Sequence, residues 1–256
     1  MKVISQNLWN INPPLDERLA AFISLCKRYA PDVLLLQENS FSDLLKTDVA
    51  SVVRSELGMN YRSTFHAGTW RGRDEGLAVI TRQEHVVDLY VPLSEGEDGM
   101  GRCLACVKLV CASRPVRFAT THLAHYPSDN ASRLRQAHQI CDALRHLMST
   151  GESSLVLGGD FNCSPCEEPA QILRNGIVPL VDPFGADESA ENWTFRADNP
   201  YAVPELGLNR RIDYLLFSKT VTCLKSEVLT PEKTGLRPWS DHSAIFIEIE
   251  TDGCVN

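Results

Sequence analysis

The chain has 256 residues, of which 43% are hydrophobic and 23% are charged, and these fractions are typical of a globular protein with a sizeable core. No apolar run reaches the roughly 18 residues needed to cross a bilayer, and the first residues lack the apolar segment of a secretory signal. We therefore expect no membrane span and a cytoplasmic location. The formal net charge of −8 disfavours a protein that grips long duplex nucleic acid, because such proteins usually present a basic face.

Short β-rich runs alternate with a few amphipathic helices along the chain. The clearest helix is predicted over Ser132–Met148, because Leu134, Ala137, Cys141 and Leu144 recur on one face. The other predicted helices are Asp16–Tyr29, Phe41–Leu57 and a short one at Pro169–Arg174. The predicted strands are Lys2–Gln6, Val33–Leu36, Gly76–Thr81, His85–Val91, Cys103–Val110, Val116–Thr121, Ser154–Leu157, Ile212–Phe217, Cys223–Leu229 and Ala244–Glu250.

Strand runs occur in both halves of the chain, and each set is broken by a helix. This arrangement favours an α/β fold in which two β-sheets pack face to face with helices outside. No internal repeat, low-complexity tract or linker is evident, so we expect one domain over residues 1–256. The stretch from about Pro183 to Asn209 is polar and rich in turn formers, and we interpret it as a long functional loop.

Nine cysteines in a chain without a secretory signal are interpreted as reduced thiols. Two pairs, Cys103/Cys106 and Cys163/Cys166, have the CxxC spacing that zinc sites use. Residues three apart on a strand point to opposite faces, which argues against a metal shared by the first pair. The second pair lies in a predicted turn without thioredoxin-like surroundings. We therefore favour buried or incidental thiols over a zinc or redox site.

Polar motifs occur where four of the strands are expected to end. They are Gln6-Asn7, Gln37-Glu38, Gly159-Asp160-Phe161-Asn162 and Ser240-Asp241-His242. Loops at strand ends can hold polar groups at controlled spacing, and the oxygen ligands of Glu38, Asp160 and Asp241 suit Mg²⁺ or Mn²⁺ better than zinc. Taken singly, each motif is explained as well by a helix cap or a solvated turn. Their joint occurrence predicts a metal-dependent site.

The order and spacing of these motifs resemble the endonuclease/exonuclease/phosphatase superfamily, whose members have the deoxyribonuclease-I-like fold. The matching segments are Asn7, PDVLLLQE (31–38), THL (121–123), GGDFNCSP (158–165), RRIDYLLFS (210–218) and WSDHSAIF (239–246), and they span nearly the whole chain. The resemblance implies a four-layer α/β sandwich of two packed, mainly antiparallel sheets flanked by helices, with the site at one edge of the sheets.

The resemblance also implies roles for the acidic and amide residues. Glu38, with Asn7 beside it, and Asp241 would hold the divalent metal, expected to be Mg²⁺ with Mn²⁺ as a substitute. Asp160 would orient or deprotonate the attacking water, and Asn162 would hold this water or the phosphate. The physical logic agrees, because a phosphodiester is anionic and resists hydroxide attack until the developing charge is neutralised.

Two histidines complete the catalytic set that the resemblance implies. His242 would contact the scissile phosphate, and Asp213 would hold its imidazole, as in Asp–His pairs generally. His122 would contact the phosphate or the leaving oxygen. The alternatives are a satisfied surface histidine at position 242 and a core or turn histidine at position 122.

Three further residues are candidate substrate contacts. Arg133 begins an Arg-x-x-Gln pattern that the superfamily uses at the start of its long helix, although helix packing explains it equally well. Trp193 and Thr194 fall where several relatives place substrate-contacting residues. A buried tryptophan that anchors the loop is the alternative.

The expected function is Mg²⁺-dependent hydrolysis of a phosphodiester by in-line water attack, most readily on DNA or RNA ends or single strands, because the acidic balance disfavours long duplex. A sphingomyelinase-type or small-molecule phosphodiesterase or phosphatase is the alternative. A non-catalytic binding relative is disfavoured, because a binding module has no need of every metal and histidine position. No protein partner is evident from the sequence.

Overall fold

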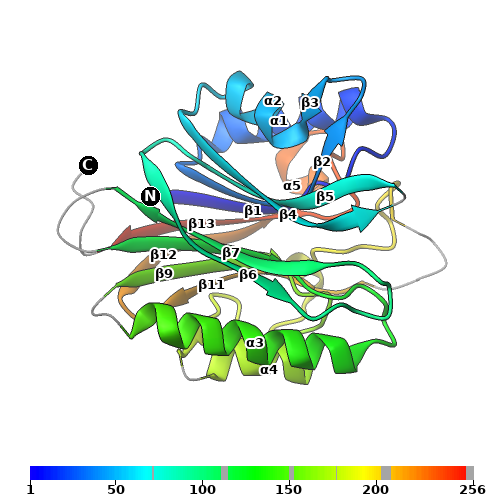
Figure 1. The fold of residues 1–256 in the computed structure, drawn as a ribbon. Helices are drawn as coiled ribbons and strands as arrows, with labels where there is room; N and C mark the ends of the chain where they lie inside the picture. Colours follow the sequence, from blue (N-terminus) through cyan, green and yellow to red (C-terminus); the bar gives the residue numbers. More distant parts are fainter. Residues whose placement is uncertain (71, 111–114, 150–152, 177, 203–208, 252–256) are drawn as a thin grey trace.

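The computed structural model describes residues 1–70, 72–110, 115–149, 153–176, 178–202 and 209–251, and its strands form two sheets (Figure 1). The first sheet contains β1 (Lys2–Asn7), β2 (Val33–Ser42), β3 (Thr47–Asp48), β4 (Tyr61–Trp70), β5 (Arg73–Thr81), β12 (Val221–Leu229) and β13 (Ala244–Thr251). The second contains β6 (His85–Leu93), β7 (Arg102–Leu109), β8 (Val116–His122), β9 (Ser154–Asp160), β10 (Leu180–Val181) and β11 (Asp213–Ser218). Their strand orders are β12-β13-β1-β2-β5-β4, with β3 paired to β2, and β10-β11-β9-β8-β7-β6.

Helices cover the outer face of each sheet (Figure 1). On the first sheet lie α1 (Leu15–Tyr29), α2 (Val49–Glu56) and the short α5 (Pro231–Thr234), and on the second lie α3 (Asn130–Met148) and α4 (Glu168–Asn175). Among the described strand pairs, β1–β2 and β8–β9 are parallel and the others are antiparallel. The predicted four-layer α/β sandwich is therefore confirmed.

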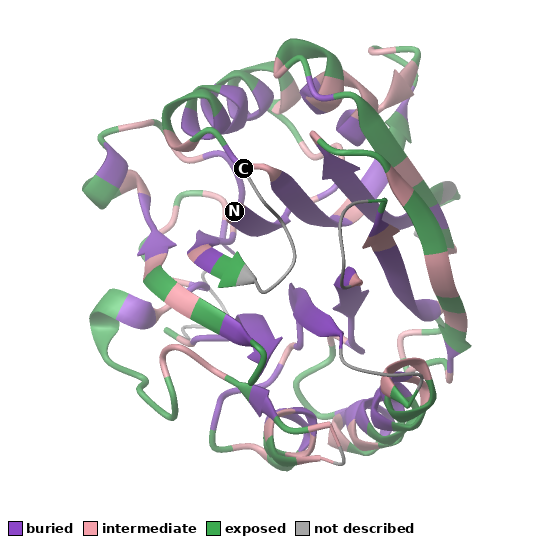
Figure 2. Cartoon of the chain, turned by 90° about the vertical axis from the view of Figure 1, so that its left-hand side faces the viewer, coloured by how far each residue is buried: buried purple, intermediate pink, exposed green. Residues whose placement is uncertain are grey.

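The alternation of side chains along each strand separates the apolar core into layers. In β1, Val3 faces the second sheet while Ile4 faces the helices α1 and α2. In β2, Leu35 likewise packs between the sheets and Leu34 packs under the helices. Because successive strand residues point to opposite faces, strands covered on both sides are apolar at nearly every position. Figure 2 shows the resulting buried interior between exposed outer surfaces.

The register of the parallel pairs brings the ends of several strands to one edge of the sandwich. Across β1 and β2, Asn7 lies opposite Gln37, the residue before Glu38. Across β8 and β9, His122 lies opposite Asp160, and the first residue of β11, Asp213, also lies opposite Asp160. Residues in register share a face of the sheet. The polar motifs of the sequence therefore meet at this edge.

The helix predicted over Phe41–Leu57 is wrong in its first half. The chain continues β2 to Ser42 and turns back through β3, and the helix begins only at Val49. Asp48 caps this helix by accepting a hydrogen bond from the amide of Ser51 at 3.0 Å. The apolar spacing that suggested a longer helix includes Leu44, whose surface is 71% exposed. The strand β4 was not predicted, and it forms the edge of the first sheet.

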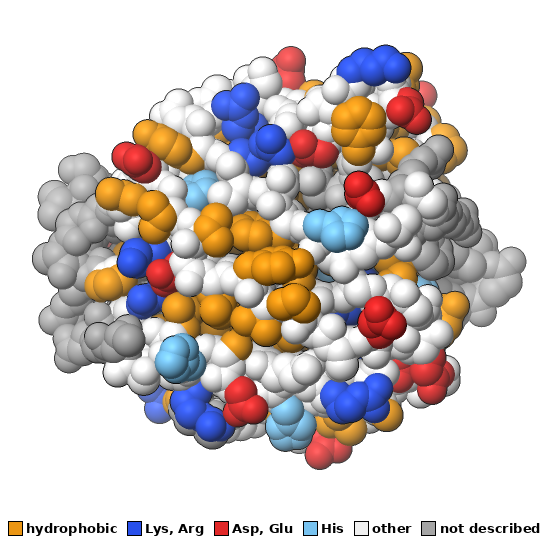
Figure 3. Space-filling view, in the orientation of Figure 1, with side chains coloured by type: hydrophobic (Ala, Val, Ile, Leu, Met, Phe, Trp, Pro, Cys, Tyr) orange, Lys and Arg blue, Asp and Glu red, His pale blue; other side chains and the backbone are white. Residues whose placement is uncertain are grey.

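The edge strands β4 and β6 lie side by side and carry exposed apolar side chains. Tyr90 stacks on Phe65 with ring centroids 6.1 Å apart and donates a hydrogen bond to the carbonyl oxygen of His66 at 2.7 Å. Val86 and Val87 of β6 are 44% and 53% exposed. Figure 3 shows hydrophobic side chains gathered across the middle of this face.

The two CxxC pairs do not form a metal site. Cys103 packs between the sheets and Cys106 packs under α3, so they lie on opposite faces of β7 as expected. Cys163 is buried whereas Cys166 is exposed. In the described part of the chain, no cysteine belongs to a cluster that could hold a metal. Of the described helices, none is long and apolar enough to cross a membrane.

Candidate active site

A pocket of about 440 Å³ opens at the edge of the sandwich where the polar motifs meet. Six of the eleven predicted site residues line it: Glu38, His122, Asp160, Asn162, Asp241 and His242. Asn7 and Asp213 lie directly behind this lining and are bonded to it, as described below. The geometry therefore brings together the eight residues predicted for catalysis and metal binding.

Asn7, at the end of β1, joins the two carboxylates that come from different sheets. Its side-chain amide donates to Glu38 Oε1 at 2.9 Å and to Asp160 Oδ2 at 3.0 Å. Its own side-chain oxygen accepts from the amide of Trp9 at 2.9 Å. Asn7 is completely buried, so these bonds hold its amide in one orientation. The distance between the two carboxylates is thereby set by a single rigid side chain.

Asp160 ends β9 and lies between two histidines. Its Oδ2 atom is 3.5 Å from Nε2 of His122 and 3.8 Å from Nε2 of His242. The other carboxylate oxygen, Oδ1, accepts from the amide of Asn162 at 2.9 Å. Asn162 has a left-handed backbone with a φ of 51°, and its side chain donates to the carbonyl oxygen of Leu123 at 3.2 Å. Such backbones are uncommon in residues other than glycine and often occur at functional sites.

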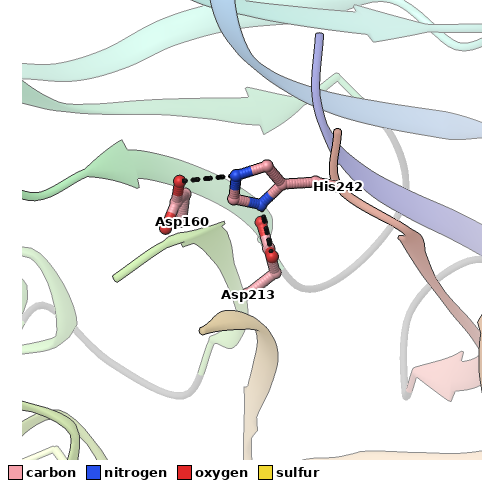
Figure 4. A group of neighbouring side chains, drawn as sticks. All are labelled: Asp160, Asp213 and His242. Atoms are coloured by element: carbon pink, nitrogen blue, oxygen red, sulfur yellow. Dashed lines mark hydrogen bonds and ion pairs between the residues drawn. The ribbon is translucent and has the colours of Figure 1, made fainter. Parts of the chain in front are cut away.

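His242 is held by the predicted carboxylate (Figure 4). Its Nδ1 atom lies 2.8 Å from Asp213 Oδ2, so Nε2 points toward Asp160 on the opposite side of the ring. Thr194 fixes the chain that carries Asp213, because its hydroxyl oxygen accepts from the amides of Ile212 and Asp213 at 3.0 and 3.1 Å.

Glu38 and Asp241 face the pocket from the first sheet. Glu38 sits at an irregularity in the pairing of β2 with β5 and has a φ of 54°, and such bulges re-aim side chains. Asp241 Oδ1 lies 4.0 Å from Nε2 of His242 and accepts a hydrogen bond from Ser240 at 3.2 Å. The hydroxyl of Ser240 is also bonded to the carbonyl oxygen of Asn7, which ties the start of β13 to the end of β1.

The crowding of charges shifts the pKa values of the pocket residues. Burial, followed by the charge of Asp213, raises the pKa of Asp160 to about 7. The pKa of Asp241 is also about 7, again chiefly through burial. Burial by itself lowers the pKa of His242, but the charges of Asp213, Asp241 and Asp160 outweigh burial and raise it well above its ordinary value.

The second histidine has the opposite shift. Burial lowers the pKa of His122 well below its ordinary value, and the positive charges of Arg102, His125 and His242 lower it further. His122 is therefore neutral at pH 7, whereas His242 is protonated. Two imidazoles of different charge thus lie on either side of the Asp160 carboxylate.

The carboxylates of this pocket fit a divalent cation. Four of them line one cavity, Glu38, Glu75, Asp160 and Asp241, and burial makes all but Glu38 prefer a proton near neutral pH. A bound cation reverses this preference and keeps the oxygens ionised. A second group, formed by Asp160, Asp213 and His242, has ligand atoms within 4.8 Å of one another and could also hold a metal. In this group Asp213 and His242 are already bonded to each other.

The structure does not bring the three predicted substrate contacts to the pocket. Arg133 is 1% exposed, and its guanidinium donates to the carbonyl oxygens of residues 124, 126 and 127. Trp193 donates from its indole to the carbonyl oxygen of Glu188 at 2.8 Å. Thr194 is completely buried behind Asp213. The contacts of Arg133 hold the loop that contains His125, and those of Thr194 hold the start of β11, which carries Asp213.

Several pocket residues were not predicted from the sequence. They are Trp9, Asn12, Glu75, Met100, Arg102, His125, Pro127, Phe195, Arg210 and Ile212. Glu75 is 5% exposed, and burial together with the charge of Glu38 raises its pKa to about 8. It directly precedes the strand predicted at Gly76–Thr81, and Arg210 begins the matching segment RRIDYLLFS. The positions of these two residues beside predicted features could have pointed to them.

An aromatic pair forms part of the rim. Trp9 stacks on Tyr201 with ring centroids 5.2 Å apart and an interplanar angle of 25°. The guanidinium of the buried Arg18 lies 4.8 Å from the centre of the Trp9 ring. Trp9 is therefore a rigid wall of the pocket rather than a loose surface side chain.

Comparison with known proteins gives one family. A model of the endonuclease/exonuclease/phosphatase family matches residues 4–242. The chain is 24% identical to Nocturnin of Rattus norvegicus over 253 residues, which cover 86% of this chain and 54% of that protein. It is also 24% identical to Nocturnin of Xenopus laevis over 243 residues, which cover 87% and 59%. The chain thus spans little more than half the length of these relatives.

Several solved structures of differently named proteins have a fold similar to that of this chain. The catalytic domain of human Nocturnin with a bound sulfate anion has a TM-score of 0.73 at 18% identity, over 98% of this chain and 94% of that chain. TDP2 from C. elegans has a TM-score of 0.76 at 20% identity, over 96% and 74%. A mannosyl-6-phosphatase of Bacteroides thetaiotaomicron has a TM-score of 0.72 at 18% identity, over 98% and 99%. At these identities the likeness shows a shared fold.

Proposed function

The chain belongs to the endonuclease/exonuclease/phosphatase family and is therefore a phosphoester hydrolase, and we propose that it is a Mg²⁺-dependent phosphodiesterase acting on nucleic-acid ends or single strands. Mn²⁺ is the expected substitute for Mg²⁺. The observation that carries this proposal is the position of Asp160, whose carboxylate lies within 3.8 Å of Asn7, His122 and His242 at once.

We assign the metal to Glu38 and Asp241, with Asn7 beside Glu38 holding its carboxylate through the side-chain amide. Carboxylate oxygens are ligands that Mg²⁺ prefers, and both carboxylates line the pocket. The group that includes His242 and Asp213 is less suited, because its imidazole is bonded to Asp213. A bound Mg²⁺ would neutralise charge on the phosphate and make water near it more acidic.

The residues of the chain then divide the remaining work. Asp160 accepts the proton of a water held by its carboxylate and by Asn162, and the oxygen of this water attacks phosphorus. The protonated His242, kept charged by Asp213, faces the phosphate and stabilises the negative charge that develops on its oxygens. The bond to the leaving oxygen breaks, and this oxygen takes a proton from the site or from solvent. His122 contacts the phosphate or this oxygen.

Two features favour a nucleic-acid end as the substrate. The net charge of −8 disfavours a long contact with many phosphates, whereas an end or a short single strand needs few. Trp9, which stacks on Tyr201, presents aromatic surface to the pocket, and bases stack on such side chains.

A small phosphorylated molecule is the second candidate. The cavity of about 440 Å³ is within the range of small-molecule sites, and one structural neighbour is a mannosyl-6-phosphatase. A substrate panel separates the two. Single-stranded and duplex DNA, RNA, a 5′-tyrosyl oligonucleotide, sphingomyelin and mannose 6-phosphate are each incubated with Mg²⁺, Mn²⁺ or EDTA. We expect turnover of single-stranded oligonucleotides with either metal and none with EDTA; turnover of mannose 6-phosphate or sphingomyelin alone would contradict the proposal.

The site assignment has its own test. Asp160→Asn and His242→Ala should each lower kcat by about 10²- to 10⁴-fold, because each removes a group that acts on the reacting atoms. Asp142→Asn is the matched control, since Asp142 lies on the outer face of α3 with 68% of its side chain exposed. Circular dichroism and thermal unfolding establish that the variants fold. Rates close to wild type in both Asp160→Asn and His242→Ala would overturn the assignment.

A further inference from the structure

A second aspartate–histidine pair, formed by Asp98 and His125, lies at the pocket. His125 Nδ1 lies 2.7 Å from Asp98 Oδ2, nearly the same separation as in the pair of His242 and Asp213. The same oxygen of Asp98 accepts a hydrogen bond from Arg102 Nη2 at 2.7 Å. His125 and Arg102 line the pocket, whereas Asp98 does not.

The three residues are held in place by buried contacts. The Asp98 side chain has no exposed surface, and its Oδ1 accepts from the amide of Met100 at 2.9 Å. Arg102 is only 3% exposed, and its Nε–H group has no hydrogen-bond partner among the described residues. An unsatisfied buried donor is uncommon and calls for an explanation. A ligand oxygen in the pocket would supply the missing acceptor.

The orientation of His125 follows from its contact with Asp98. The two ring nitrogens of an imidazole lie on opposite sides, so a ring whose Nδ1 faces the buried Asp98 directs its Nε2 away from it. His125 contributes to the pocket wall with 33% of its side chain exposed. Asp98 thus orients both Arg102 and His125 as donors toward the cavity.

This group lies close to the scissile centre. The charges of Arg102 and His125 both act on His122, which is itself 3.5 Å from Asp160. The proposed mechanism uses Asp160, His122 and His242 for one phosphate and leaves Arg102 and His125 without a task. Guanidinium and imidazole donors held by a carboxylate are suited to a phosphate oxygen.

We propose that Asp98, Arg102 and His125 form a second anion subsite, which binds a terminal phosphate next to the scissile phosphodiester. This inference rests on the proposed function and deepens it, because it makes a phosphorylated nucleic-acid end the favoured substrate over an end with a hydroxyl. His125 and Arg102 contact the terminal phosphate, and Asp98 is a positioning residue.

The test compares short single-stranded oligonucleotides that differ only at their ends. One set carries a 5′-phosphate, one a 3′-phosphate and one hydroxyls at both ends, and initial rates are measured over a range of concentrations with Mg²⁺. We expect wild type to show a KM about 10-fold lower for one of the phosphorylated ends. His125→Ala should raise this KM about 10-fold and abolish the preference for the phosphorylated end over the hydroxyl-ended strand.

His138→Ala is the matched control, because His138 is an exposed histidine on α3 outside the pocket. Asp98→Asn separates positioning from contact, since it should reproduce part of the KM effect without removing a donor to the substrate. A wild-type KM that is the same for phosphorylated and hydroxyl-ended strands would overturn the subsite. An equal rise of KM on all strands in His125→Ala would also overturn it, because a merely structural role predicts that result.

A binding measurement separates this inference from the proposed function. Asp160→Asn is titrated with fluorescent oligonucleotides bearing phosphate or hydroxyl ends, and the anisotropy gives Kd without turnover. A preference for the phosphorylated end that His125→Ala abolishes supports the subsite, even if wild type hydrolyses no oligonucleotide and the proposed function fails. Hydrolysis by wild type without any such preference leaves the proposed function standing and overturns the subsite.

Discussion

The Asp98 side chain has no exposed surface, yet its pKa lies well below the ordinary value of a carboxyl group. Burial by itself would raise the pKa, but the hydrogen bond from His125, the charge of Arg102 and the amide of Met100 lower it by more. A carboxyl group whose pKa is lower in the folded chain than in the unfolded chain stabilises the fold at pH values above its unfolded pKa. This contribution is lost as the pH falls through the range between the two values.

We therefore expect Asp98→Asn to reduce the free energy of unfolding by about 1–3 kcal/mol at pH 7. The difference from wild type should be constant from pH 7 to pH 5 and should shrink below about pH 4, where the carboxyl group of the unfolded chain takes up its proton. Urea unfolding of both proteins at pH 7, 5, 4 and 3.5 measures this. A difference that does not change with pH would mean that the ionised carboxylate is not the stabilising group.

The sequence predicted some site residues and not others for a physical reason. Asp160 is the last residue of β9, Glu38 lies at a bulge of β2, and His242 lies just before β13, so the pairing of the strands places them together. His125 and Arg102 meet through Asp98, which lies in the irregular segment between β6 and β7. The conformation of such a segment is set by tertiary contacts rather than by local spacing. The second aspartate–histidine pair therefore could not be predicted from the sequence.

At the scale of elements, α3 holds the loop that leads from β8 into the pocket wall. The guanidinium of Arg133 donates to the carbonyl oxygens of Ala124, Tyr126 and Pro127 at 3.1, 2.6 and 3.0 Å. Gln136, one turn further, accepts from the amide of Ala124 at 2.9 Å. The Arg-x-x-Gln pattern thus fastens the helix to the loop that contains His125.

We expect Arg133→Met to lower the free energy of unfolding by about 2–4 kcal/mol, because three carbonyl oxygens lose the buried guanidinium that donates to them. Arg135→Met, on the exposed side of the same helix, should change it by less than about 0.5 kcal/mol. Chemical denaturation followed by tryptophan fluorescence gives both values. If Arg133→Met proved as stable as wild type but bound substrate more weakly, the role first predicted for Arg133, a substrate contact, would be supported instead.

The predicted helices and strands were correct where the local sequence pattern was compatible with only one kind of structure. The helical spacing in Ser132–Met148 has few alternatives over so long a run, and α3 was found within two residues of it. In Phe41–Leu57 the same spacing covered the end of β2, a hairpin and a short helix. The pairing of β2 with β3 and β5 determines the structure of this region. The spacing of apolar residues along the sequence contains no information about such contacts between strands.

At the scale of the whole molecule, the expectation of one domain can be tested through the thiols. Of the cysteines in the described residues, five are buried: Cys26 under α1, Cys103 between the sheets, and Cys106, Cys141 and Cys163 under α3 and α4. Burial raises the pKa of Cys103 and Cys163 to about 12. Because the thiolate is the reactive form, these groups should not react with alkylating reagents at pH 7 while the chain is folded.

If the sandwich is one cooperative unit, the five buried thiols should become reactive over the same range of urea concentration. Pulsed alkylation with N-ethylmaleimide, followed by mass spectrometry of the peptides that contain them, reads each position separately. Cys166 is exposed and should react without urea, and Cys166→Ser should remove this signal and leave the five transitions in place. Two independently folding layers would instead expose Cys26 and Cys141 at different midpoints, since these cysteines lie in the outer layers on opposite sides of the paired sheets.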